Sequence, residues 1–279
     1  MIDNLPVKTL KYKNLTIEGY SRAAVQTYWR FPELKIGFDL GAQPWSFMGT
    51  PTWFVSHGHL DHIAALPVYV ARRRMMKMEP PTIYLPQTAI DPVQSILQQF
   101  TRLDRGKLPC KLLPISVGDE VELSREHVVT AYATEHSVPS LGFIVWERKR
   151  KLKPEYESLR ENEIRDLRTS GKEVSNELRL PLLAYLGDSA PEGLDACPIM
   201  YEADVLITEM TFISPHHQRD KIHKFGHLHL DDIVERRERF KNKLIIASHF
   251  STRYHGNTIR KLVEKKLPDM LDGRLHLWF

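Results

Sequence analysis

A short segment that follows an apolar run holds most of the potential for metal chemistry in this sequence. Residues 56–62 contain three imidazoles and one carboxylate, which belong to His57, His59, Asp61 and His62. Side chains alternate along an extended chain, so His57 and His59 face the same way. Asp61 and His62 begin a predicted helix and can face a neighbouring point. Two metal ions would satisfy all four groups, because zinc prefers imidazole and carboxylate ligands.

Three later segments each place one ligand-type side chain just past a β-type run. These side chains are His136, Asp188 and His249. Strand ends can share one sheet edge, so we expect the three to lie near the first motif. A single strand-end histidine is more often a hydrogen-bonded structural residue, but the three sites support one another when taken with residues 56–62.

The composition agrees with metal or acid–base chemistry. The chain has thirteen histidines among 279 residues and only two cysteines, Cys110 and Cys197. Two distant cysteines exclude a disulfide framework and a zinc site made of several thiolates. The net charge of +4 allows an anionic partner without requiring one.

Short β-type runs and helical patterns alternate along the chain, which predicts a layered α/β or α+β protein. The expected strands cover 34–40, 52–56, 82–85, 121–134, 141–145, 182–186, 205–208 and 244–247. The expected helices cover about 61–78, 88–102, 229–240 and 257–266. Residues 1–10 hold no apolar run of signal-peptide length, and no stretch approaches the length of a membrane span. We therefore expect a cytoplasmic protein with no membrane contact.

One segment differs in composition from the rest. Residues 147–179 contain ten basic and eight acidic residues among 33 positions. Such a pattern is typical of a solvated helical hairpin or a mobile insertion. The alternative is an arm that contacts a substrate or a second subunit.

The order of the motifs resembles the metallo-β-lactamase superfamily. The resemblance runs from Asp39, through residues 56–62, to His249. It implies an α+β fold with a four-layer αββα sandwich, a single domain over 1–279 with an insertion or arm at about 147–179. It also implies that Asp39 supports the ligand turn through hydrogen bonds.

The resemblance further implies a cage for two zinc ions, although manganese or iron could occupy ligands of this type. One ion would be held by His57, His59 and His136. The other would be held by Asp61, His62 and His249, and Asp188 would bridge the two.

Four segments are similar to the ribonuclease Z branch of the superfamily, whose members are tRNA 3′-endonucleases. They are residues 135–143, 208–212, 225–227 and 248–254. This similarity implies a phosphodiesterase that acts on RNA, with tRNA precursors as the specific expectation, and a possible homodimer. It implies that Asp61 accepts a proton, that His227 donates one, and that Glu209 orients His227. The alternatives are a helix cap for His227 and a structural salt bridge for Glu209.

Three features depart from the ribonuclease Z pattern. The expected Pro-x-Lys-x-Arg-Asn loop is absent near residues 18–23, Leu228-His229 replaces Ser-Thr, and the charged segment lacks a Gly-Pro-rich tip. All three concern substrate recognition, so other hydrolases of small phosphodiesters, thioesters or lactams stay open, as does a non-enzymatic metal-binding scaffold.

We expect His229 to be a surface residue, and the basic residues 72–74 to lie on a solvated face or to contact RNA.

Overall fold

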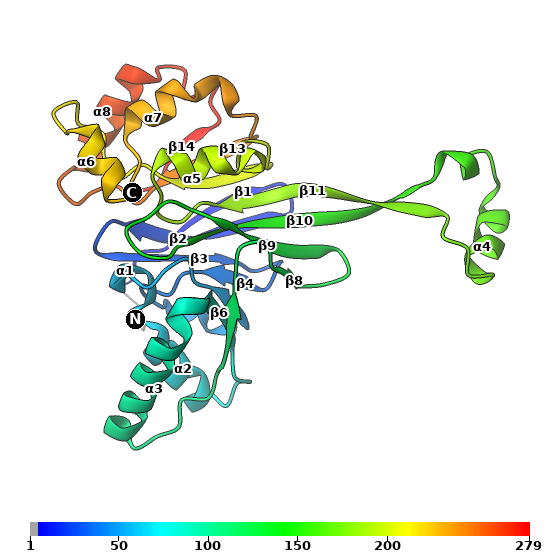
Figure 1. Cartoon of the computed structure of the whole chain (residues 1–279), viewed down its shortest axis with the longest axis horizontal. Coiled ribbons are helices and arrows are strands. Elements are labelled where there is room, and N and C mark those ends of the chain that lie inside the picture. Colours follow the sequence, from blue (N-terminus) through cyan, green and yellow to red (C-terminus); the bar gives the residue numbers. More distant parts are fainter. Residues whose placement is uncertain (1–4) are drawn as a thin grey trace.

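Two seven-stranded sheets pack face to face, and helices cover the outer face of each (Figure 1). The computed structural model describes residues 5–279. This arrangement confirms the predicted four-layer αββα sandwich. Within the described residues, no helix is long and apolar enough to cross a membrane.

The first sheet is built from the N-terminal part of the chain, in sequence order. Its first four strands pair in antiparallel fashion, and the rest add in parallel. The strands are β1 (Lys8–Tyr12), β2 (Leu15–Arg22), β3 (Gln26–Phe31), β4 (Ile36–Phe38), β5 (Thr52–Phe54), β6 (Thr82–Pro86) and β7 (Lys111–Ile115).

The second sheet has the same plan, with an antiparallel half followed by a parallel half. Its strands are β8 (Glu120–Glu122), β9 (His127–Ala133), β10 (Leu141–Leu152), β11 (Ser175–Tyr185), β12 (Val205–Glu209), β13 (Leu244–Ser248) and β14 (Leu275–Leu277).

The helices divide between the two outer faces and the charged segment. Those on the first sheet are α1 (Leu60–Ile63), α2 (Leu66–Met75) and α3 (Ile90–Asp104). The second sheet carries α5 (Pro191–Ala196), α6 (Arg219–Lys224), α7 (Leu230–Glu235) and α8 (Gly256–Lys266), and α4 (Glu161–Thr169) lies in the charged segment. Single 3₁₀ turns cover Trp45–Gly49, Gln87–Ala89, Pro154–Tyr156, Pro198–Tyr201 and Arg237–Arg239.

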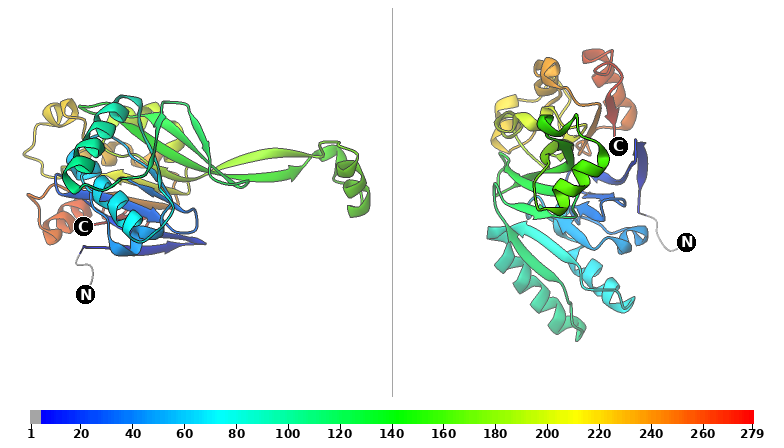
Figure 2. Two further views of the ribbon diagram at one scale, coloured as in Figure 1. Left: turned by 90° about the horizontal axis from the view of Figure 1, so that it is seen from below. Right: turned by 90° about the vertical axis from the view of Figure 1, so that its right-hand side faces the viewer.

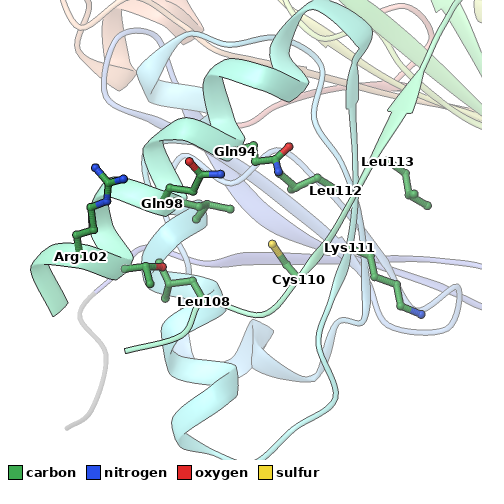
Figure 3. A pocket seen from close by; sticks show the side chains of 10 residues that line it. Gln94, Gln98, Arg102, Leu108, Cys110, Lys111, Leu112 and Leu113 are labelled. Atoms are coloured by element: carbon green, nitrogen blue, oxygen red, sulfur yellow. The ribbon is translucent and has the colours of Figure 1, made fainter. Parts of the chain in front are cut away.

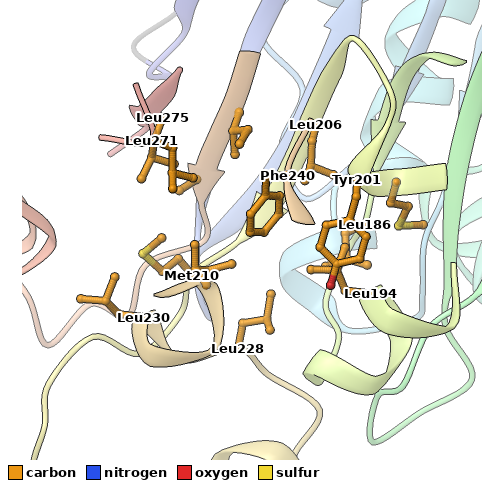
Figure 4. Close-up of a cluster of buried hydrophobic side chains, with 14 of the residues drawn as sticks. Leu186, Leu194, Tyr201, Leu206, Met210, Leu228, Leu230, Phe240, Leu271 and Leu275 are labelled. Atoms are coloured by element: carbon orange, nitrogen blue, oxygen red, sulfur yellow. The ribbon is translucent and has the colours of Figure 1, made fainter. Parts of the chain in front are cut away.

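Alternate residues of the central strands supply two separate cores. In β13, Leu244 and Ile246 pack between the sheets, whereas Ile245 and Ala247 pack under the outer helices. A strand that is buried on both faces is expected to be apolar throughout. The outer core is filled by side chains such as Tyr201 and Phe240, whose ring centroids lie 5.0 Å apart (Figure 4).

Stacked aromatic rings fill the space between the sheets near the ends of β4 and β11. The ring of Phe38 stacks on Tyr185 with a centroid distance of 4.8 Å, and on Phe143 with a centroid distance of 5.6 Å. Phe54 also contacts Phe143. All four side chains are buried, so these rings hold the two sheets in one register.

The structure corrects several predicted element boundaries. The strand predicted over 121–134 is a hairpin of β8 and β9, because the hydroxyl of Ser124 accepts the backbone N–H groups of Glu126 and His127 in a tight turn. The helix predicted over 61–78 is split into α1 and α2. The sequence interpretation also missed β1, β2, β3, β7 and β14.

The charged segment forms a long arm, and the expected helical hairpin is wrong. Strands β10 and β11 leave the body as a two-stranded antiparallel ribbon that pairs as far as Leu152 and Ser175. The helix α4 lies beyond the end of the ribbon (Figures 1 and 2). The backbone groups of the ribbon pair with each other, so the charged side chains can stay in solvent.

Replacing Phe143 with alanine should lower the free energy of unfolding by about 3–5 kcal/mol, because it leaves a cavity between the sheets. Urea denaturation followed by tryptophan fluorescence measures this change. Phe225→Ala is the matched control, since its ring is 62% exposed and its loss should cost under about 0.5 kcal/mol. Equal losses for the two variants would contradict the assigned core.

Candidate functional site

Strand ends from both sheets meet at one edge of the sandwich and bring the predicted ligands together. In the first sheet, Asp39 follows β4 and His57 follows β5. In the second sheet, His136 lies between β9 and β10, Asp188 follows β11, and His249 follows β13. Residues that are far apart in the sequence therefore converge because neighbouring parallel strands end at the same edge.

Three imidazoles form the first group of candidate ligands. Nε2 of His57 lies 3.1 Å from Nδ1 of His59, and the same Nδ1 lies 3.1 Å from Nε2 of His136. The three nitrogens lie within 4.8 Å of one another, which is close enough to share one ion. His57 is buried, whereas His59 and His136 are partly exposed.

A second group contains two imidazoles and one carboxylate. Nε2 of His62 lies 3.3 Å from Nε2 of His249, and the latter lies 3.4 Å from Oδ2 of Asp61. Asp61 also accepts the backbone N–H of Ala24 at 2.8 Å, which fixes the carboxylate at the start of α1. This group also fits within 4.8 Å.

The buried carboxylate of Asp188 lies between the two groups. Its Oδ2 is 3.4 Å from Nε2 of both His62 and His249, and 3.9 Å from Nε2 of His57. Burial alone would raise the pKa of Asp188, but the neighbouring imidazoles of His249 and His62 hold it well below its usual range. Asp188 is therefore placed to contact ions in both groups.

Hydrogen bonds behind the ligands fix the orientation of their rings. Asp39 accepts Nδ1–H of His62 at 2.8 Å and the backbone N–H of Ser56 at 2.7 Å, as predicted. The carbonyl of Gly226 accepts Nδ1–H of His136 at 2.8 Å. These bonds leave Nε2 of each ring free to face the centre of the site.

Two site residues have backbone conformations that side chains rarely adopt. Asp39 has a φ of 58° and His249 has a φ of 59°. Left-handed backbone at residues other than glycine costs free energy, and it is concentrated at functional sites. Gly226, with a φ of 73°, also lies in the left-handed region, and a Cβ there would in addition lie 2.4 Å from Cα of His136.

His227 and Glu209 form a hydrogen-bonded pair beside the ligand groups. Nδ1 of His227 lies 3.1 and 3.2 Å from the two carboxylate oxygens of Glu209, the last residue of β12. Burial lowers the pKa of His227, but the charge and hydrogen bond of Glu209 raise it to about 9. The ring of His227 is 5.1 Å from that of His136, centroid to centroid.

Glu209 is anchored on several sides. It accepts the backbone N–H groups of Ser189 at 2.7 Å and Leu228 at 3.1 Å, together with the hydroxyl of Thr211. A buried carboxylate with this many donors is fixed in place. Its role is therefore more than a simple salt bridge, because it ties β11, β12 and the His227 loop together.

The chemistry of the donor set fits divalent metal ions. Pairs of imidazole nitrogens lie 3.1–3.3 Å apart. His62 and His136 already donate their Nδ1–H groups to Asp39 and to the carbonyl of Gly226, so their Nε2 atoms carry lone pairs. Two lone pairs in contact repel each other unless a cation or proton lies between them. Imidazole and carboxylate donors together match zinc and also suit manganese or iron.

Several candidates from the sequence lie elsewhere or play other parts. His229 is 2% exposed and caps α7 by accepting the backbone N–H of Asp231, so its predicted surface position is wrong. Arg73 is also buried, and it donates to the carbonyl groups of Met48 and Glu79. Arg73 therefore supports the fold and cannot contact RNA.

The sequence interpretation missed the groups that support the ligands from behind. Thr211 contacts Nδ1 of His249 at 3.0 Å, and Ser56 contacts Nδ1 of His57 at 3.0 Å. Tyr185 donates to Asp39 from the other sheet. Thr211 and Ser56 stand within recognised motifs, but Tyr185 sits in an apolar run that gives no signal of a polar role.

Two grooves on the first-sheet side differ in their relation to the site. One of about 710 Å³ lies between α3 and β7, and none of the candidate ligands lines it (Figure 3). Another, of about 420 Å³ and mostly apolar, extends from Gly58 and Leu60 beside the ligands to Phe100 on α3. Only the second groove borders the ligand-bearing motif.

Comparison with known proteins gives the family. A family model described as beta-lactamase superfamily domain matches residues 52–250. The tRNase Z TRZ1 of Arabidopsis thaliana is 36% identical over 274 residues, which cover 96% of each chain.

Two solved structures share the fold. The metallo-beta-lactamase fold protein YhfI of Bacillus subtilis aligns with a TM-score of 0.62 and 15% identity, over 93% of this chain and 92% of that one. Human tRNase Z, short form, aligns with a TM-score of 0.53 and 19% identity, over 86% and 87%. These two structures show the shared fold, and the family model together with the relative from Arabidopsis thaliana shows that the chain belongs to the ribonuclease Z family of the metallo-β-lactamase superfamily.

Proposed function

We propose that this protein is a metal-dependent phosphodiesterase that cleaves RNA and removes the 3′ extension from tRNA precursors. The observation that carries this proposal is the convergence of two ligand groups on Asp188, next to the His227–Glu209 pair. The relatives named tRNase Z support the choice of RNA, because one of them matches nearly the whole chain.

We place two zinc ions in the site. The first would be held by His57, His59 and His136, the second by Asp61, His62 and His249, and Asp188 would contact both. When bound, such ions neutralise charge on a phosphodiester and activate water at neutral pH.

The chain's own groups would then manage the protons. Asp61 would accept the proton of the attacking water, because its carboxylate is exposed to the site and held by Ala24. His227 would donate a proton from Nε2 to the leaving oxygen, since Glu209 already occupies its Nδ1. Glu209 would keep the imidazole protonated and aimed at the substrate.

We assign the arm at 147–179 to RNA contact and treat the whole chain as one domain with that insertion. The exposed side chains of Lys149 and Lys151 on β10 would contact phosphate groups without reading sequence. The departures of the arm tip and of residues 18–23 from the family pattern mean that the way in which RNA is held differs from that of typical members.

Two further assignments complete the proposal. Both cysteines are free, which suits a reducing compartment, and we place the protein in the cytoplasm. We also propose a homodimer, because apolar side chains gather on the outer helices of the first sheet. Among them are Leu60, Met75, Ile96, Phe100 and Leu103.

Metal analysis of purified protein loaded with zinc should give two equivalents per chain. His136→Ala and His249→Ala should each lose one equivalent, because each removes a ligand from a different group. Mass spectrometry of dialysed protein measures this ratio. His276→Ala is the matched control, since His276 is exposed on β14 and should keep both equivalents. A single equivalent in the parent protein would contradict a two-metal cage.

His227→Ala should slow cleavage of a tRNA precursor by about 10²–10⁴-fold, because the leaving ribose oxygen needs a proton. The same variant should hydrolyse bis(p-nitrophenyl) phosphate at nearly the parent rate, since p-nitrophenolate leaves without protonation. Initial rates on both substrates test this contrast. Unchanged cleavage of the precursor would exclude His227 as the acid. If the parent protein hydrolyses a thioester or lactam and neither phosphodiester, the alternative hydrolase functions are favoured.

Phe100→Glu should convert a dimer into a monomer, because a carboxylate would be buried without a partner at the interface. Sedimentation velocity measures the mass of each variant. Leu178→Glu on the arm is the control, as it places the same charge at a similarly exposed apolar position. If the parent protein sediments as a monomer, the proposed dimer is wrong.

A further inference from the structure

A buried hydrogen bond between the two sheets reaches the ligand groups from behind. Tyr185, the last residue of β11, donates its hydroxyl hydrogen to Oδ2 of Asp39, which follows β4 in the other sheet. Tyr185 is 3% exposed and Asp39 is fully buried. The tyrosine ring is held in place by its stack on Phe38, with centroids 4.8 Å apart and planes 13° apart.

The same carboxylate holds one ligand ring. Oδ2 of Asp39 lies 2.8 Å from Nδ1 of His62, while Oδ1 accepts the backbone N–H of Ser56 at 2.7 Å. The donors around a buried carboxylate decide its rotation, because no water can replace a missing one. Without the hydroxyl of Tyr185, Oδ2 keeps only the donors from His62 and Ser56, and the carboxylate is free to turn toward them.

The orientation of His62 determines where its ligand nitrogen points. Nε2 of His62 lies 3.3 Å from Nε2 of His249 and 3.4 Å from Oδ2 of Asp188, so a small rotation of the ring opens this group. The ring of His136 in the first group is oriented by the carbonyl of Gly226 instead. Asp39 contacts His62 directly, whereas it reaches the first group only through Ser56, whose hydroxyl lies 3.0 Å from Nδ1 of His57. We therefore expect a change at Oδ2 of Asp39 to act mainly on the second ligand group.

We propose that Tyr185 is a positioning residue that fixes Asp39, and through it His62, and so sets the affinity of the metal site made by Asp61, His62 and His249. This inference rests on the two-metal proposal above. It goes beyond that proposal by assigning the second site's affinity to a tyrosine of the opposite sheet, which itself contacts no ligand nitrogen.

A second tyrosine offers a matched control. Tyr201 also donates its hydroxyl to a carboxylate, that of Asp195, at 2.6 Å, and it is also buried. This pair lies in the outer helical layer, where Arg236 binds the same carboxylate. Tyr201→Phe therefore removes the same kind of hydrogen bond as Tyr185→Phe, away from the ligands.

The experiment compares zinc affinity and metal-free stability in these variants. Tyr185→Phe keeps the ring and its stacking and removes only the hydroxyl. Chelator competition gives the zinc dissociation constant of each equivalent, and urea denaturation of the metal-free protein gives its free energy of unfolding. We expect Tyr185→Phe to weaken one equivalent by about 10–100-fold, as loss of a supporting hydrogen bond does. Tyr201→Phe should leave both equivalents unchanged.

Double variants assign the weakened equivalent to its site. In a His136→Ala background, which retains the second group, Tyr185→Phe should weaken the remaining zinc by about 10–100-fold. In a His249→Ala background, which retains the first group, it should change the remaining zinc by less than about threefold. Equal weakening in both backgrounds would show general structural support and overturn the inference.

The other outcomes separate this inference from the proposed function. If Tyr185→Phe changes neither dissociation constant, Tyr185 does not position His62. If the parent protein binds no zinc, the metal proposal and this inference both fail. If the parent binds two equivalents but cleaves no tRNA precursor, only the substrate assignment fails.

Discussion

The buried carboxylate of Asp188 imposes the constraint that the rest of the site satisfies. It lies within 3.4–3.9 Å of nitrogens from three imidazoles, and almost no water reaches it. A buried charge is costly unless positive charge or donors surround it. The sandwich supplies that surrounding by ending strands of two different sheets at one edge. Left-handed backbone at Asp39 and His249 costs free energy, and the packed structure around the site offsets that cost.

The sequence was sufficient to predict which candidate ligands converge but not the groups that hold them. Residues 56–62 contain four candidate ligands, and His136, Asp188 and His249 each follow an apolar run. Because strand ends can share one sheet edge, these residues are expected to lie close together. Tyr185 lies inside such a run, where an aromatic side chain is expected to pack in the hydrophobic core. Its hydroxyl gains a role only because the opposite sheet places Asp39 above it, and the pairing of two sheets is a long-range contact that no local pattern encodes.

The same limit explains the errors in the fold. Charged residues are read as solvated, yet Arg73 is buried because three carbonyl groups of neighbouring loops need its donors. The burial of β2 alternates without a break, but Gly19 and Ser21 occupy two of its buried positions, so the sequence shows no long apolar alternation there. The turn at Ser124 divides a run that is apolar enough for one strand. In the charged segment, composition predicts exposure correctly, but it does not distinguish a β ribbon from a helical hairpin, since both keep charged side chains in solvent.

The arm and the site share one strand, and this continuity links their positions. Strand β11 begins at Ser175 in the arm, enters the core near Leu183, and ends at Tyr185, three residues before Asp188. Its pairing with β10 is continuous except for a shift of register at Val145 and Trp146, where the exposed ribbon joins the buried sheet. A slip of one residue in the ribbon would turn every side chain to the opposite face. The buried half of the strand forbids such a slip, because it would move Leu183 from the core between the sheets to the core under the outer helices and would displace Asp188. The register of the arm is therefore fixed by the same packing that places the carboxylate of Asp188.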